Sequence, residues 1–152
     1  MFGALVREAR AEHWFVAGEV PDTLDGRFAM LATIVALATV RLERGGAPAH
    51  QQAVALAERF VEAMDAEHRQ LGIGEPGLGK KVRKLVGALS RRVELWREAI
   101  DGGDWDVAVF ASLFPAGQAS PAALGYCGTA LRDFWSRLER SSDQALAEGT
   151  IG

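Results

Sequence analysis

Apolar residues recur along most of the chain at spacings of three and four, the repeat that turns one side of an α-helix toward a core. No segment alternates apolar and polar residues between turn signals, so the pattern predicts no β-strands. Glycine, proline and capping residues divide the sequence into predicted helices over about 2–17, 23–44, 49–71, 76–101, 104–114 and 121–140. The chain is therefore expected to form an all-α, single-domain bundle of about six helices.

Two of these predicted helices have distinctive patterns. The second contains the uncharged apolar run Phe28–Val40, which is closed by Arg27 and Arg41. This run is much shorter than the roughly 20 apolar residues that cross a bilayer, so it predicts a central buried helix and no transmembrane segment. The fourth predicted helix has the most regular apolar stripe, formed by Val82, Leu85, Leu89, Val93, Trp96 and Ile100.

Length and composition narrow the class of protein further. The 152 residues suit one domain over about 1–140, and the tail over 141–152 is expected to fray. A hydrophobic content of 49% and a net charge of −3 exclude an intrinsically disordered chain. The single cysteine, Cys127, excludes a disulfide scaffold and fits a reducing compartment. The first residues lack the apolar core of a secretory signal, so a bacterial cytoplasmic protein or a mature organelle protein is expected.

Two segments match the sequence patterns of functional sites but lack the neighbouring residues or secondary structure that such sites require. The segment 74–80 reads GxxxxGK, but a phosphate-binding loop continues with Ser or Thr and follows a strand. Here Lys81 comes next and a predicted helix comes before, so the segment is interpreted as a glycine-rich turn between helices. Asp65 and His68 have the i, i+3 spacing of a metal-binding pair, yet a four-helix metal site needs a second such pair. Neither His13 nor His50 has a carboxylate three residues before it, so His68 is interpreted as a boundary residue.

No group of residues argues for an enzyme. Cys127 lies on the apolar stripe of the last predicted helix and has no flanking cations to lower the pKa of its thiol, so a buried, inert side chain is expected. No serine lies in a GxSxG context. The sequence therefore predicts no catalytic residues, no metal ligands and no cofactor.

The fourth predicted helix is strongly basic although the whole chain is slightly acidic. Helical spacing places Lys80, Lys84 and Arg91 opposite its apolar stripe, with Lys81 beside them and Arg92 at the border. Such a face is often only solvated. The functional interpretation is a docking face for ribosomal RNA, anionic lipid or an acidic protein. Because the basic patch is local, binding to double-stranded DNA is not expected.

A second polar cluster, Asp22, Thr23, Asp25 and Arg27, precedes the most apolar helix. Asp22 or Thr23 can cap the helix, and carboxylates stabilise its N-terminus. A cation in the first turn opposes the helix dipole, so Arg27 is expected to have a carboxylate or a partner protein beside it.

The segment Val20–Phe28, with sequence VPDTLDGRF, resembles the signature of the ubiquinol–cytochrome c chaperone family. In that family an apolar helix ending in Arg-Leu follows, here Arg41-Leu42. A second block resembling the family contains Met64-Asp65, Arg69 and Gly72–Glu75, and a third runs from Gly79 to Arg92. The resemblance covers about residues 14–100.

The resemblance implies an assembly factor that binds newly made cytochrome b during biogenesis of the ubiquinol–cytochrome c reductase complex, without a cofactor. It implies work in the bacterial cytoplasm, either free or peripheral on the inner membrane. The alternative is an adaptor that docks on a ribosome or membrane surface through the basic helix. A client with hydrophobic helices would need an apolar groove. The residues expected to face the client, or else to form an internal ion-pair network, are Asp22, Thr23, Asp25, Arg27, Asp65, Arg69 and Arg92.

Overall fold

A computed structural model describes residues 1–70 and 78–152, and within them every regular element is helical. The α-helices are α1 (Phe2–Ala9), α2 (Leu24–Glu43), α3 (Ala47–Gln70), α4 (Leu78–Ile100), α5 (Trp105–Leu113), α6 (Pro121–Arg140) and α7 (Asp143–Ala147), and a short 3₁₀ helix, η1, spans Glu12–Trp14. The predicted all-α class is confirmed. The expected turn at 74–80 lies mostly outside the described residues, because α4 is described from Leu78.

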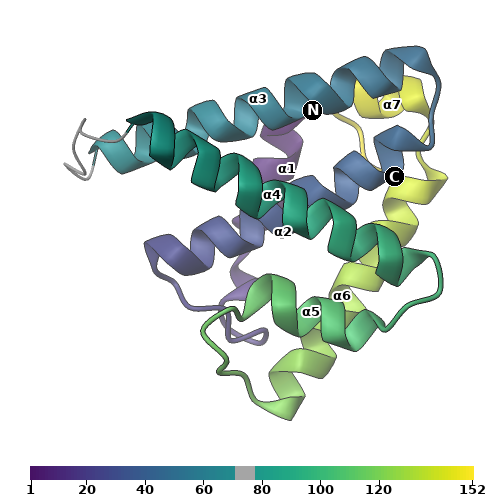
Figure 1. Ribbon diagram of the computed structural model, residues 1–152. Coiled ribbons are helices and arrows are strands. Elements are labelled where there is room, and N and C mark those ends of the chain that lie inside the picture. The colour runs from purple at the N-terminus through teal and green to yellow at the C-terminus, as the bar shows by residue number, and fades with distance from the viewer. Residues whose placement is uncertain (71–77) are drawn as a thin grey trace.

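Helix α2 lies in the middle of the bundle, and α1, α3, α4, α5 and α6 all pack against it (Figure 1). Thr23 caps its N-terminus, where the side-chain oxygen accepts a hydrogen bond of 3.1 Å from the Gly26 amide. From Ala29 to Leu42 nearly every side chain is buried, on all sides of the helix. This confirms the predicted central buried helix, since a helix apolar all round needs neighbours all round. No helix among the described residues is long and apolar enough to cross a bilayer.

Helices α3 and α4 lie side by side across α2 (Figure 1). The predicted stripe of α4 faces the core, with Leu85, Leu89 and Trp96 buried. For α3, helical spacing predicts a stripe that includes Val54, Phe60 and Met64. Phe60 and Met64 are buried, but Val54 is exposed and Leu56 is buried instead.

The first predicted helix is broken in two. Helix α1 ends at Ala9, and the chain is extended at Ala11 before η1. This turn brings the fully buried Trp14 back under α1, where its indole N–H donates a hydrogen bond of 2.8 Å to the Glu8 carbonyl. Burial of a large aromatic side chain outweighs the loss of one helical turn.

A chain of buried polar groups joins α4, α5 and α2. The indole N–H of Trp96 donates to Ser112 Oγ at 3.0 Å, and Ser112 Oγ lies 2.5 Å from Thr33 Oγ1. Thr33 in turn donates to the Ala29 carbonyl at 2.7 Å. If the Ser112 hydroxyl donates to Thr33, the Trp96, Ser112 and Thr33 side chains each have an acceptor for their hydrogen, as buried polar groups require.

Helix α7 lies within the segment 141–152, which the sequence predicts to fray. Leu146 is completely buried and Ser142 caps the helix. Arg41 of α2 holds this segment, because its guanidinium donates to the carbonyls of Leu138 and Ser141 and to the Asp143 carboxylate at 2.9 Å. These contacts join residues about a hundred positions apart, which a sequence pattern does not reveal.

Docking of α7 should be acid-sensitive. The Gly46 amide donates a hydrogen bond to Asp143, and together with Arg41 it lowers the pKa of this carboxyl below its usual value. A carboxyl with a lowered folded-state pKa stabilises the fold above its unfolded pKa of about 4, and the stabilisation is lost as pH falls through the folded value. Wild type should therefore be more stable than Asp143→Asn near neutral pH, with the difference vanishing in acid. Urea unfolding at a series of pH values measures this, and a difference independent of pH would contradict it.

Candidate functional site

The predicted cluster at the start of α2 lies on the molecular surface. Arg27 has the carboxylate partner that its position requires, since its Nε lies 2.9 Å from Asp22 Oδ1. Both side chains are more than half exposed, so the pair contributes little stability. Thr23 is committed to the cap of α2, and Asp25 follows it in the first turn. Asp22 and Arg27 therefore remain accessible to a partner.

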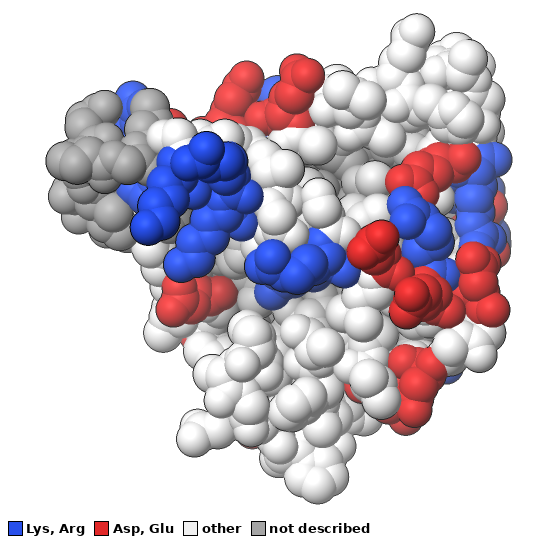
Figure 2. Space-filling view, viewed as in Figure 1, with Lys and Arg blue, Asp and Glu red and all other residues white. Residues whose placement is uncertain are grey.

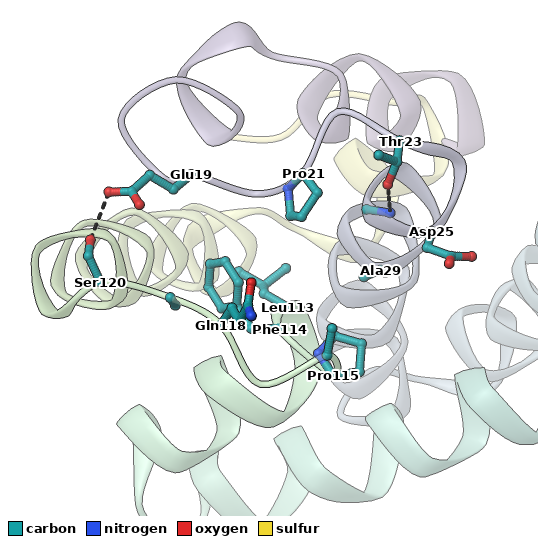
Figure 3. Close-up of a pocket in the computed structure, with 13 residues that line it drawn as sticks. Glu19, Pro21, Thr23, Asp25, Ala29, Leu113, Phe114, Pro115, Gln118 and Ser120 are labelled. Atoms are coloured by element: carbon teal, nitrogen blue, oxygen red, sulfur yellow. Dashed lines mark hydrogen bonds between the residues drawn. The ribbon is translucent and has the colours of Figure 1, made fainter.

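Beside this cluster lies a pocket of about 530 Å³ between the start of α2 and the loop after α5 (Figure 3). Its apolar lining includes Ala29, Leu113, Phe114 and Pro115, and Thr23 and Asp25 belong to its rim. Gly26 lets the wall approach this closely, because a Cβ atom there would overlap the Pro21 carbonyl. Two of the predicted client-facing residues thus border an accessible apolar pocket.

Asp65 and Arg69 form an ion pair on α3, with Arg69 Nε 3.1 Å from Asp65 Oδ2. The Asp65 side chain is 19% exposed and that of Arg69 is 49% exposed. Asp65 Oδ1 is buried and accepts no hydrogen bond from the residues that the structure describes. The i, i+4 spacing places both residues on one face as predicted. They are not among the residues that line the pocket at the start of α2.

Arg92 is directed inward, unlike its neighbour Arg91. Its guanidinium donates two hydrogen bonds, of 3.2 and 3.0 Å, to the Ser112 carbonyl near the end of α5, and one to Ala88. It also stacks over the Phe28 ring, with Cζ 5.6 Å from the ring centre. Burial, together with the charge of Arg91, lowers the pKa of Arg92 to about 10, so it stays protonated at neutral pH. This geometry favours a structural role for Arg92.

The basic face of α4 is presented to solvent. Lys80, Lys84 and Arg91 are exposed and Lys81 is half-buried, as helical spacing predicts. Figure 2 shows the resulting gathering of cationic side chains over the first half of α4. Between them and α2 lies a hollow of about 310 Å³ with Phe28 and Leu85 in its lining, and Asp25 separates it from the apolar pocket.

The sequence reasoning missed Glu19 and the loop after α5, both of which line the apolar pocket. The available signal was the absence of charge, because no residue from 107 to 131 is acidic or basic. In Figure 2 the corresponding lower part of the molecule is almost free of charged side chains. Val107 and Phe110 of α5 are exposed there, at 58% and 38%.

The two other candidate sites are the Asp65–His68 pair and Cys127. Among residues 1–70 and 78–152, no group of three or more His, Cys, Asp or Glu side chains is placed to hold a metal ion. The His68 side chain, needed for the metal hypothesis, lies outside the described residues. Cys127 is fully buried and its Sγ lies 3.4 Å from the Gly18 carbonyl. The expected burial is confirmed, and burial, with the nearby Glu19 carboxylate, raises the pKa of its thiol to about 11, which disfavours the thiolate.

Comparisons with known proteins place this geometry in a family context. A profile of the family described as ubiquinol-cytochrome C chaperone matches residues 17–151, well beyond the 14–100 over which motifs were recognised. The chain is similar to the crystal structure of the Cbp3 homolog from Brucella abortus, with 30% identity and a TM-score of 0.85. The similarity covers 99% of this chain and 84% of that one. No curated protein matches the chain.

Proposed function

The chain belongs to the ubiquinol–cytochrome c chaperone family, and from this premise we propose that it binds newly made cytochrome b during assembly of the ubiquinol–cytochrome c reductase complex. It acts by protein binding, without catalysis and without a cofactor. The observation that carries the proposal is the apolar pocket at the start of α2, because one side of its lining comes from the segment that resembles the family signature. Clients with hydrophobic helices need such an apolar surface until they are inserted.

The client-facing surface consists of Asp22, Thr23, Asp25 and Arg27 with the neighbouring pocket. All four residues are exposed, and Thr23 and Asp25 lie on the rim of the pocket, which supports this assignment. The internal contacts of Arg92 and the Asp65–Arg69 ion pair support the alternative role of fixing the bundle. The protein works at the cytoplasmic face of the inner membrane.

Deletion of the gene tests the proposal. Assembled complex and cytochrome b should fall while their transcripts remain, and the wild-type gene supplied in trans should restore both. Haem b absorbance spectra and native gels of membranes measure the two quantities. Normal spectra and normal complex levels in the deletion strain would reject this function.

The basic face of α4 supports a second candidate function, docking on a ribosome or an anionic membrane surface. Its cations cluster in a chain whose net charge is −3, and a surface rich in phosphate attracts such a cluster. Changing Lys80, Lys84 and Arg91 to Glu should abolish sedimentation with ribosomes or with anionic vesicles. The matched control changes the exposed Arg7, Arg10 and Arg140 to Glu, which alters the net charge equally away from this face. Equal sedimentation of both triple variants would reject docking through α4.

A further inference from the structure

The apolar pocket at the start of α2 has an acidic rim. Figure 3 shows Glu19 and Asp25 on opposite sides of the pocket, with Pro21 and Pro115 between them. None of the lining residues is basic. Apolar walls with carboxylates at the edge suit a ligand that is hydrophobic and carries a positive charge.

Glu19 is the stronger of the two candidates for cation binding. Among the described residues its carboxylate has one hydrogen-bond donor, the Ser120 hydroxyl at 2.7 Å, and no ion pair. That hydroxyl also accepts a bond from the Ala123 amide as the cap of α6, which fixes its direction. Asp25 also borders the hollow that contains Lys84 and Arg91, so its charge is partly balanced.

The backbone holds Glu19 in an unusual conformation. Its φ of 55° lies in the left-handed region, which is unfavourable for a residue with a side chain. The neighbouring residues enforce it, because Gly18 and Val20 are buried and the Val20 amide donates to the Trp14 carbonyl at 3.1 Å. The Glu19 side chain is thereby exposed at the edge of an apolar wall.

We propose that this pocket takes the junction between an apolar transmembrane segment and its cationic flank, with Glu19 as the partner of the flanking Lys or Arg. This inference rests on the proposed function, since membrane-protein clients carry Lys and Arg beside the cytoplasmic ends of their apolar helices. Pro115 and Ala116 are the exposed apolar residues in this part of the lining, and they contact the apolar end, whereas Leu113 and Phe114 are almost fully buried. The volume of about 530 Å³ accommodates a few side chains rather than a whole helix. An occupant that covers Glu19 also removes water and strengthens the ion pair.

Binding of synthetic peptides tests the proposal in vitro. The probe is a short, fluorescently labelled leucine- and alanine-rich peptide that ends in two lysines, compared with versions ending in two serines or two glutamates. Wild type should bind the lysine peptide more tightly than the glutamate peptide. Added salt should weaken binding of the lysine peptide more than binding of the other two. Glu19→Gln should reduce affinity for the lysine peptide about tenfold and leave the serine peptide unchanged. Glutamine can still accept the Ser120 hydrogen bond, so the fold is retained.

Two further variants complete the test. Glu94→Gln removes an exposed carboxylate on α4 that does not line this pocket and should bind like wild type. Ala116→Trp, at an exposed lining position, should fill the pocket and lower the affinity for all three peptides. Equal affinity of wild type and Glu19→Gln for the lysine peptide, or undiminished binding by Ala116→Trp, would overturn the proposal. Selective binding of the lysine peptide, together with normal levels of the assembled complex in the deletion strain, would support the proposed ligand of this pocket and reject cytochrome b as the client.

Discussion

Gly26→Ala should lower the free energy of unfolding by about 3 kcal/mol. The added Cβ would overlap the Pro21 carbonyl, and both partners belong to backbone that the cap of α2 holds in place. Alanine is the better helix former by about 1 kcal/mol, so the overlap outweighs propensity. The shift of Pro21 also moves one wall of the apolar pocket, so binding of apolar peptides should weaken in the folded fraction. Urea unfolding followed by circular dichroism measures the first effect.

Gly125→Ala is the matched control. Gly125 is an exposed position within α6, and no atom lies within 4 Å of the Cβ that alanine would add. The same substitution should there stabilise the protein by about 0.5–1 kcal/mol. If both variants were stabilised, the close approach of Pro21 to α2 would not be a constraint on the fold.

Arg92→Ala should be the second most damaging change, lowering the free energy of unfolding by about 2–3 kcal/mol. It leaves the Ser112 carbonyl, near the end of α5 where no helical partner is available, without its two charged donors. It also removes a cation from the C-terminal end of the α5 dipole and from the face of Phe28. Urea unfolding measures the loss.

Arg91→Ala separates this structural role from the effect of charge. Arg91 is the preceding residue, carries the same charge and is exposed on the basic face. Its removal should change stability by less than about 0.5 kcal/mol and should weaken sedimentation with anionic surfaces. If Arg92→Ala were as stable as Arg91→Ala and failed only in client binding, Arg92 would belong to the client-facing surface.

The parts of the fold that were predictable from sequence are those determined by local periodicity. The stripes of α4 and α6 are buried as their spacing indicates, from Leu85 to Trp96 and from Cys127 to Leu138. The break after α1 depends on where Trp14 finds a core, and α7 depends on Arg41. Both depend on contacts made only after the chain has folded.

The candidate site also has a part that was predictable from sequence and a part that was not. The cluster at the start of α2 was found because capping residues and charges lie next to each other in the sequence. The pocket beside it was missed because Glu19 and Leu113–Pro115 meet only in the folded bundle, about a hundred residues apart along the chain. The sequence predicts that Arg92 faces the client or joins an ion-pair network, and its actual acceptors are backbone carbonyls, which leave no mark on composition.

The polar groups around Ser112 have a consequence for how the pocket is used. The hydroxyl of Ser112 is held by Thr33 and Trp96, and its carbonyl is held by Arg92. The next residues, Leu113 and Phe114, form the apolar lining of the pocket. The lining is thus preorganised, so the entropic cost of association falls on the client segment rather than on the chaperone. Such a receptor can bind quickly, because no conformational change in the chaperone has to accompany association.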